Sequence, residues 1–226
     1  MSTPRSTNKY SVMKTIILSL CLWLAAIAAH AEGTIILLVD ISSSITVDQM
    51  HLQMDSYATA MRQLASLRHV NIEVVTFDEG PRWIHSGDNL AAATAFETFE
   101  VVPPEYRGST CLGDALILIE TMISSLPQPV VLDISGDGEA NCSRREQIPL
   151  ILDRMAAEGV RVNTLFVDNI TGMPDEDTEI PPRETHYQFY QRLVRNGGFT
   201  IHAQDFFDFE LALFEKLVLE VAQLKE

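Results

Sequence analysis

Residues 34–44 read T-I-I-L-L-V-D-I-S-S-S, and this stretch decides the fold. The run T-I-I-L-L at 34–38 is β-branched and aliphatic without polar alternation, which is typical of a strand that is buried on both faces. Such strands occur in parallel sheets that helices cover on both sides. Asp40 ends the run, and Ser42 and Ser44 follow. The stretch therefore predicts a buried strand with oxygen-bearing side chains at its carboxyl end.

Further apolar runs predict the remaining strands, at residues 70–77, 130–134 and 160–167, with a weaker run at 199–202. The turn sequence Asp78-Glu79-Gly80-Pro81 is a hairpin signal, so residues 82–85 are expected to form an antiparallel edge strand. Helical segments separate most of the other runs. Residues 32–226 are therefore predicted to form one α/β domain, a doubly wound, mostly parallel sheet with helices on both faces.

Three helices are predicted from apolar residues that alternate at spacings of four and three, which is the pattern of a helix that packs on a core. The three stripes are Met50, Met54, Tyr57, Met61 and Leu64; Leu112, Leu116, Ile119 and Ile123; and Phe207, Leu211, Phe214, Val218 and Val221. Each stripe is expected to face the core. Further helices are expected over residues 89–99, 149–157 and 184–195.

The first 31 residues have the pattern of a secretory signal peptide. The only charges there are Arg5, Lys9 and Lys14; an apolar run at 15–28 follows, and Ala29-His30-Ala31 supplies an A-x-A cleavage site. Cleavage after Ala31 would make the protein periplasmic or secreted. A retained membrane anchor is the alternative, and lipidation at Cys21 is disfavoured because Leu20 stands where lipoprotein signals carry a small residue.

The charge of the chain bears on its partners. The net charge is −15, and cleavage removes three positive and no negative charges, which leaves −18. This balance disfavours nucleic acid and anionic membrane surfaces as partners. We expect neither nucleic-acid binding nor stable membrane insertion after cleavage.

Three segments carry oxygen donors where a strand ends or a helix begins. They are D-I-S-S-S at 40–44, G-S-T-C-L-G-D-A-L at 108–116 and S-G-D-G at 135–138. In an open α/β sheet, ligands bind beyond the carboxyl ends of the strands, so these segments are expected to converge. D-x-S-x-S alone is a weak signal, because Asp and Ser also cap helices. The agreement of three segments favours a binding site.

The combination D-x-S-x-S, T-x-x-G-x-A-L and D-G after an apolar strand resembles von Willebrand factor type A domains and integrin inserted domains. The resemblance covers nearly all of residues 32–226, and the I-S-G-D-G variant is similar to that of an uncharacterised bacterial exported subfamily. It implies a metal-ion-dependent adhesion site (MIDAS). The residues that match its ligand positions are Asp40, Ser42, Ser44, Thr110 and Asp137.

The donor chemistry points to a small hard cation. Two carboxylates and three hydroxyls suit Mg²⁺ or Mn²⁺, with Ca²⁺ possible in principle, and suit Zn²⁺ poorly. Such a shell leaves residual positive charge, to which a protein or peptide partner can supply an acidic side chain. Ser43, Gly138, Glu139 and Asn141 are the expected rim of the ligand approach.

Two cysteines remain after cleavage, Cys111 and Cys142, and an exported chain with two thiols predicts a disulfide between them. Two buried free thiols are the alternative. The bond would tie the Thr110 segment to the Asp137 segment. Residues 169–184, an acidic connection, are expected either to be a solvated loop or to form a selectivity rim. Asp133 stands inside an apolar strand without an explanation from the sequence.

The leading hypothesis is a metal-ion-dependent binding module without catalytic residues. One alternative is a metal-dependent hydrolase or phosphotransferase with Asp40 as nucleophile. It is disfavoured because Ser42 stands where an aspartyl-phosphate fold would carry a second carboxylate, and because no lysine lies near the three segments. The other alternative is a structural or assembly factor, in which the ion only stiffens the loops.

Overall fold

The computed structural model describes residues 33–138, 140–142, 144–168 and 185–225. All of them belong to one compact unit, Glu32–Glu226. The predicted signal peptide and the acidic connection at 169–184 lie outside the described residues. Within the described part, no helix is long and apolar enough to cross a membrane.

A six-stranded sheet forms the centre of the unit, in the order β3-β2-β1-β4-β5-β6. Its strands are β1 (Thr34–Asp40), β2 (Asn71–Phe77), β3 (Pro81–Asp88), β4 (Val130–Gly136), β5 (Arg161–Val167) and β6 (Thr200–Ala203). Neighbouring strands pair in parallel except β2 and β3, which are antiparallel. The predicted fold class and the antiparallel edge strand are therefore confirmed.

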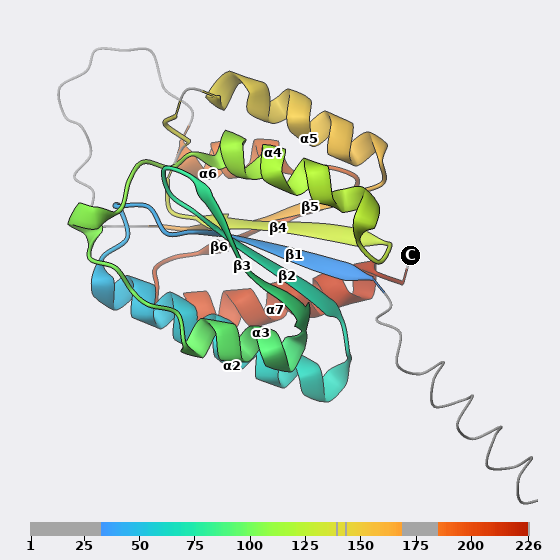
Figure 1. The fold of residues 1–226 in the computed structure, drawn as a ribbon, viewed down its shortest axis with the longest axis horizontal. Coiled ribbons are helices and arrows are strands. Elements are labelled where there is room, and N and C mark those ends of the chain that lie inside the picture. Colours follow the sequence, from blue (N-terminus) through green and yellow to red (C-terminus); the bar gives the residue numbers. More distant parts are fainter. Residues whose placement is uncertain (1–32, 139, 143, 169–184, 226) are drawn as a thin grey trace, which may run out of the picture. The chain divides into compact units, whose positions relative to one another are not determined.

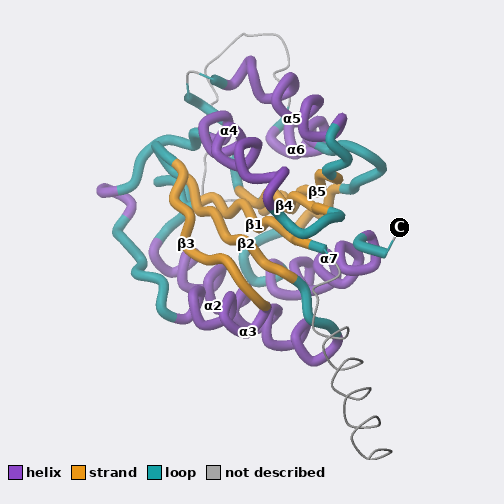
Figure 2. Tube along the Cα trace, turned by 45° about the vertical axis from the view of Figure 1, so that its right-hand side comes forward, coloured by secondary structure: helices purple, strands orange, loops and turns teal. Residues whose placement is uncertain are grey.

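Helices cover both faces of the sheet (Figure 1). On one face lie α2 (Val47–Leu67), α3 (Asn89–Glu97) and α7 (Phe209–Gln223); on the other lie α4 (Leu112–Met122), α5 (Ile148–Ala157) and α6 (His186–Leu193). Figure 2 shows the same three layers from a second direction. Ile35, Leu37 and Val39 of β1 belong to one core cluster, and Ile36 and Leu38 belong to the other. Because successive side chains of a strand point to opposite faces of the sheet, β1 contributes to both cores.

Two of the three predicted helix stripes face the core, those of α2 and α4. The prediction for α7 is wrong for most of its five residues, since only Val221 is buried and Phe214 is partly buried. Phe207 is 82% exposed, Leu211 65% and Val218 41%, while the buried face of α7 includes Phe209, Leu213 and Leu217. The pattern misled because Lys216 and Glu220, which look like surface residues, lie on that buried face and are fully buried.

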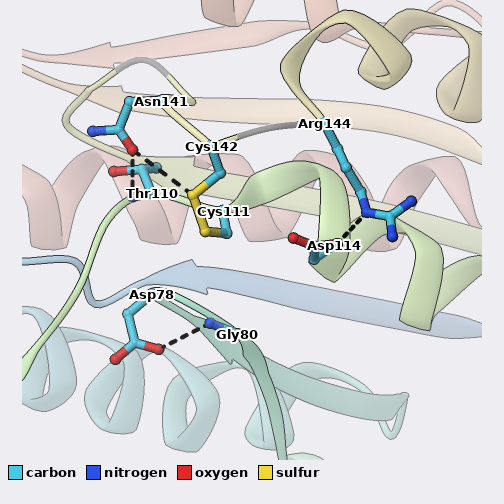
Figure 3. The surroundings of a disulfide bond; sticks show 8 residues. All are labelled: Asp78, Gly80, Thr110, Cys111, Asp114, Asn141, Cys142 and Arg144. Atoms are coloured by element: carbon cyan, nitrogen blue, oxygen red, sulfur yellow. Dashed lines mark hydrogen bonds and ion pairs between the residues drawn. A yellow bond between two sulfur atoms is a disulfide. The ribbon is translucent and has the colours of Figure 1, made fainter.

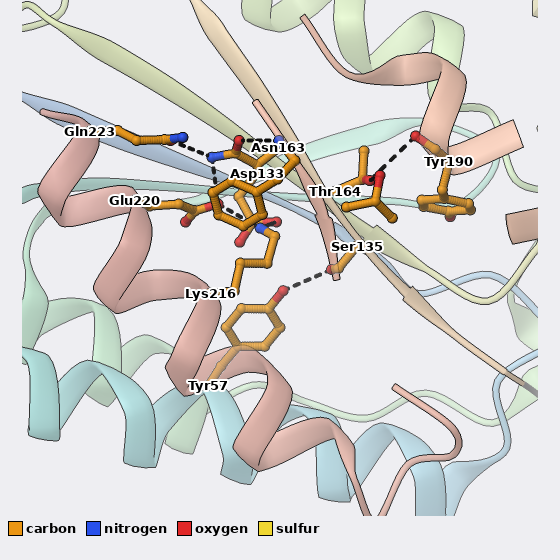
Figure 4. A network of polar contacts seen from close by, with 11 residues as sticks. Tyr57, Asp133, Ser135, Asn163, Thr164, Tyr190, Lys216, Glu220 and Gln223 are labelled. Atoms are coloured by element: carbon orange, nitrogen blue, oxygen red, sulfur yellow. Dashed lines mark hydrogen bonds and ion pairs between the residues drawn. The ribbon is translucent and has the colours of Figure 1, made fainter. Parts of the chain in front are cut away.

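The buried charges of α7 explain Asp133 of β4 (Figure 4). Lys216 forms ion pairs with Asp133 and, at 2.6 Å, with Glu220, and all three side chains are inaccessible to solvent. Asn163 of β5 donates to Glu220 over 3.1 Å. Burial and the nearby Asp133 carboxylate raise the pKa of Glu220 to about 7, and burial raises the pKa of Asp133 as well. Lys216 thus pairs with two carboxyl groups, and below about pH 7 a proton on Glu220 completes the charge balance.

Candidate metal centre

The loop after β1 contacts both of the other predicted ligand segments at the carboxyl ends of the strands. The Ser43 N–H donates to the carbonyl oxygen of Gly108 over 3.1 Å. The Ser44 hydroxyl donates to Asp137 Oδ1 over 2.7 Å, and Ser42 Oγ lies 3.1 Å from Ser44 Oγ. Residues that are 93 positions apart in the chain are thereby in direct contact.

The second segment is tied to Asn141 and Cys142, which lie a few residues after the third segment (Figure 3). The Thr110 N–H donates to Asn141 Oδ1 over 2.9 Å, and the Asn141 N–H donates to the Thr110 carbonyl oxygen over 3.2 Å. Cys111 and Cys142, the residues directly after Thr110 and Asn141, form the predicted disulfide, with Cα atoms 5.0 Å apart. The first segment thus touches the other two, and the second is tied to residues 141–142, which follow the third after a short gap; we call these contacts together the ring.

The serines do not cap the helix that follows them. Thr46 is the N-cap of α2, and Gln49 completes a capping box with it. The alternative role for Ser42 and Ser44 as helix caps is therefore wrong. Their hydroxyls are directed instead at each other and at Asp137.

Asp40, the last residue of β1, is fully buried. Its Oδ1 accepts the Ser42 N–H over 2.8 Å, whereas its Oδ2 is buried without a hydrogen-bond partner. Burial and the Asp137 carboxylate raise the pKa of Asp40 to about 8. A buried carboxylate with an unsatisfied oxygen requires either a proton or a cation. A divalent cation would supply the missing partner.

Gly136 and Tyr190 border Asp40. A Cβ at Gly136 would overlap the Tyr190 hydroxyl and lie 2.8 Å from Asp40 Oδ2. Tyr190, on α6, is buried, and its pKa is raised by burial and by the charges of Asp40 and Asp137. A side chain at residue 136 would therefore displace the Asp40 carboxylate from its observed position.

Arg107 holds the first segment, and the sequence reasoning missed it. Its guanidinium donates to the carbonyl oxygens of Ile41 over 3.2 Å and Ser42 over 3.0 Å, and also to that of Ile45. The side chain is 8% exposed, and its charge acts on Asp40 and Asp137. The spacing of apolar residues could not have revealed this role of Arg107. The signal in the sequence was a basic residue directly before Gly108.

The predicted ligands differ in exposure. Asp40, Ser42, Thr110 and Asp137 are buried, while Ser44 is exposed. Of the predicted rim residues, Ser43 and Asn141 are exposed and Gly138 is half-buried, while Glu139 lies outside the described residues. Among the described residues, no group of three or more His, Cys, Asp or Glu is arranged to hold a metal ion. A metal site at the ring would thus depend on hydroxyl ligands.

A family model described as "Protein of unknown function (DUF1194)" matches residues 81–225, more than half of the chain. The chain belongs to this family. The matched part of this DUF1194 member includes Thr110, Asp137 and both cysteines of the disulfide and begins after the Asp40 segment. No curated protein matches the chain.

Solved structures establish that the fold is that of von Willebrand factor type A domains. Proximal thread matrix protein 1 from the mussel byssus matches with a TM-score of 0.60 and 17% identity over 85% of this chain and 47% of its own. A von Willebrand factor type A protein from Catenulispora acidiphila matches with a TM-score of 0.59 and 14% identity over 86% of this chain and 43% of its own. BatB from Bacteroides thetaiotaomicron matches with a TM-score of 0.55 and 17% identity over 84% of this chain and 99% of its own.

The chain thus spans about half the length of the first two of these proteins and nearly all of BatB. The mussel protein has also been solved with a zinc-occupied MIDAS motif, with a TM-score of 0.57 to this chain. At identities below one fifth, these similarities concern the fold.

Proposed function

We propose that this protein is an exported binding module that holds a divalent cation and captures an acidic side chain of a protein or peptide partner. The proposed ligands are Asp40, Ser42, Ser44, Thr110 and Asp137. The observation that carries the proposal is the ring of contacts among three segments, with Ser44 bonded to Asp137 and Asp40 Oδ2 left without a hydrogen bond.

The donor set fits a hard cation. Two carboxylates and three hydroxyls are typical ligands of Mg²⁺ and Mn²⁺, and Ca²⁺ also binds oxygen ligands, although it needs more of them. Because a zinc-occupied MIDAS motif exists in the mussel protein, Zn²⁺ belongs in the test despite its preference for nitrogen and sulfur. We propose Mg²⁺ or Mn²⁺ as the resident ion.

The exposed side of the ring faces the partner. When bound, the ion supplies a Lewis-acid position that a carboxylate oxygen can complete. Arg107 holds the Ser42 carbonyl by a hydrogen bond, and the exposed Ser43 and Asn141 border the approach of the partner. The chain's own residues therefore hold the ion and orient the partner, and no catalytic group is part of the proposal.

Export is supported by two observations. The Cys111–Cys142 disulfide is the kind of bond that persists in oxidising compartments such as the periplasm. Residues 1–31 have the charge, the apolar run and the A-x-A site of a signal peptide. N-terminal sequencing of the exported protein tests this part; a chain that retains residues 1–31 would contradict it.

Calorimetric titration with Mn²⁺, Mg²⁺, Ca²⁺ and Zn²⁺ tests the ion site. Mn²⁺ is expected to bind with a stoichiometry of one, and Asp40→Asn and Asp137→Asn are expected to abolish binding. Asp153→Asn is the matched control, because Asp153 is an exposed carboxylate that pairs with Arg195. Circular dichroism shows whether each variant is folded. Unchanged binding in a folded Asp137→Asn variant would refute the site.

Capture of a partner is tested separately. Immobilised protein is expected to retain an exported partner with Mg²⁺ present and to release it with EDTA, and re-added Mg²⁺ is expected to restore capture. Capture that is indifferent to EDTA would indicate that the ion is structural. Steady turnover of a phosphate or ester substrate that is lost in Asp40→Asn would indicate an enzyme instead.

A further inference from the structure

Helix α7 is apolar on two opposite faces. Its inner face packs Phe209, Leu213 and Leu217 into the core. On its outer side lie Leu211, Phe214 and Val218, and Phe207 precedes the helix by two residues. The four follow one another at spacings of four, three and four, and we call them the outer stripe. Phe207, Leu211 and Val218 are exposed, and Phe214 is partly buried. A helix that is apolar on both faces is usually covered on both faces.

The outer stripe borders a groove against α2. The groove has a volume of about 300 Å³; Thr59, Ala60 and Gln63 of α2 line one side, and Phe207, Glu210, Leu211 and Phe214 line the other. Figures 1 and 2 both show α2 and α7 beside each other under the sheet. Alternating spacings of three and four are the pattern with which one helix packs against another, so the groove has the form of a helix-docking site.

The charges around the groove are acidic. The exposed charged residues of α7 are Glu210 and Glu215, and Asp55 is exposed on α2 one turn before Thr59. Arg62 of α2 is paired with Glu97 at 2.5 Å, so its charge is compensated. A second copy of this chain would bring the same acidic groups to the contact, and an anionic membrane would be repelled. A partner with basic residues is complementary.

We propose that the groove between α2 and α7 docks an amphipathic helix of another protein, with Lys or Arg residues on both sides of its apolar stripe. The apolar stripe of that helix covers Leu211 and Phe214, and its basic residues lie opposite Glu210 and Glu215. The docking site uses no residue of the proposed metal centre. The two proposals can therefore fail independently.

Two synthetic 18-residue peptides test the proposal. Both carry leucines at alternating spacings of three and four; one has Lys and the other Glu at the positions that flank the leucines. Fluorescence anisotropy with the purified protein, at physiological salt, is expected to show at least tenfold tighter binding of the Lys peptide. Equal binding of the two peptides, or binding of neither, would overturn the proposal.

Variants locate the binding surface. Leu211→Gln is expected to weaken binding of the Lys peptide at least tenfold and to leave Mn²⁺ binding unchanged. Leu150→Gln is the matched control, because Leu150 is 60% exposed on α5, on the other face of the sheet. Equal effects of the two substitutions would show that the peptide binds by charge alone and would overturn the proposal.

Two further measurements exclude the other occupants. Analytical ultracentrifugation is expected to show a monomer, and a dimer that Leu211→Gln dissociates would assign the groove to a second copy. Flotation with phosphatidylglycerol vesicles is expected to leave the protein unbound, and co-flotation that Leu211→Gln abolishes would assign the groove to a membrane. Either of these results would overturn the proposal.

Discussion

Replacing Glu220 by Gln is expected to stabilise the protein at pH 8 and to have a much smaller effect on its stability at pH 5. The folded protein raises the pKa of Glu220 from 4.5 to about 7, mainly because the side chain is buried. A carboxyl group with a raised pKa contributes stability that is fully present below its unfolded pKa and is lost as the pH rises through its folded pKa. The wild type therefore loses this contribution between about pH 4.5 and pH 7.

The size of the effect follows from the pKa difference. At about 1.4 kcal/mol per pKa unit, the ionisation of Glu220 costs up to about 3 kcal/mol of folding free energy. Gln stays neutral and still offers an oxygen to Lys216 and to Asn163, which now donate to Glu220. For a domain of this size, about 3 kcal/mol corresponds to roughly 6–12 °C in Tm.

Urea unfolding of the wild type and of Glu220→Gln at pH 5 and pH 8 measures the effect. The difference between the two proteins isolates Glu220 from Asp40, whose pKa of about 8 adds a dependence of the same sign to both. Lys216→Met is the companion variant. It is expected to be destabilised at both pH values, because Asp133 and Glu220 lose the cation that pairs with them, and more strongly at pH 8, where Glu220 is ionised. A Glu220→Gln protein that is less stable than the wild type at pH 8 would refute the reasoning.

Three further predictions concern the ring of contacts. The double variant Cys111→Ala/Cys142→Ala is expected to lose about 3–4 kcal/mol of stability in urea unfolding, because the chain-entropy model assigns that amount to a loop with a sequence separation of 31. The variant is also expected to bind Mn²⁺ more weakly. An unchanged Mn²⁺ affinity would show that the disulfide does not shape the site. Arg107→Gln is expected to lose about 3–5 kcal/mol in the same assay, since three carbonyl oxygens lose a charged donor; a loss below about 1 kcal/mol would contradict this role. Gly136→Ala is expected to lower the free energy of unfolding by about 1–3 kcal/mol and to weaken Mn²⁺ binding, since the new Cβ would displace Asp40. A Mn²⁺ affinity equal to that of the wild type would show that Asp40 tolerates the shift.

Much of the fold could be predicted from the sequence because apolar residues dominate its central strands. β1, β2, β4 and β5 lie between helices, so each is buried on both faces, and their apolar residues mark them as strands although Glu73, Asp133 and Asn163 are buried among them. The convergence of the ligand segments followed from one rule, that ligands of such sheets bind beyond the carboxyl ends of the strands.

The parts that could not be predicted depend on long-range polar contacts. Lys216 and Glu220 are buried because Asp133, on a strand far away in the chain, pairs with Lys216. Arg107 is buried because the carbonyl oxygens of another loop accept its hydrogen bonds. Neither contact shows in the spacing of apolar residues along the chain. The hydrophobic pattern therefore assigned the wrong face of α7 to the core and did not reveal Arg107.

The most direct test of the proposed metal centre is the anomalous diffraction of a crystal soaked in Mn²⁺. The proposal predicts one strong peak bordered by the side-chain oxygens of Asp40, Ser44 and Asp137, and a peak lost in crystals of Asp137→Asn. A soaked crystal of the folded protein with no peak between these side chains would contradict the account, and the chain would then be a von Willebrand factor type A fold without its ion.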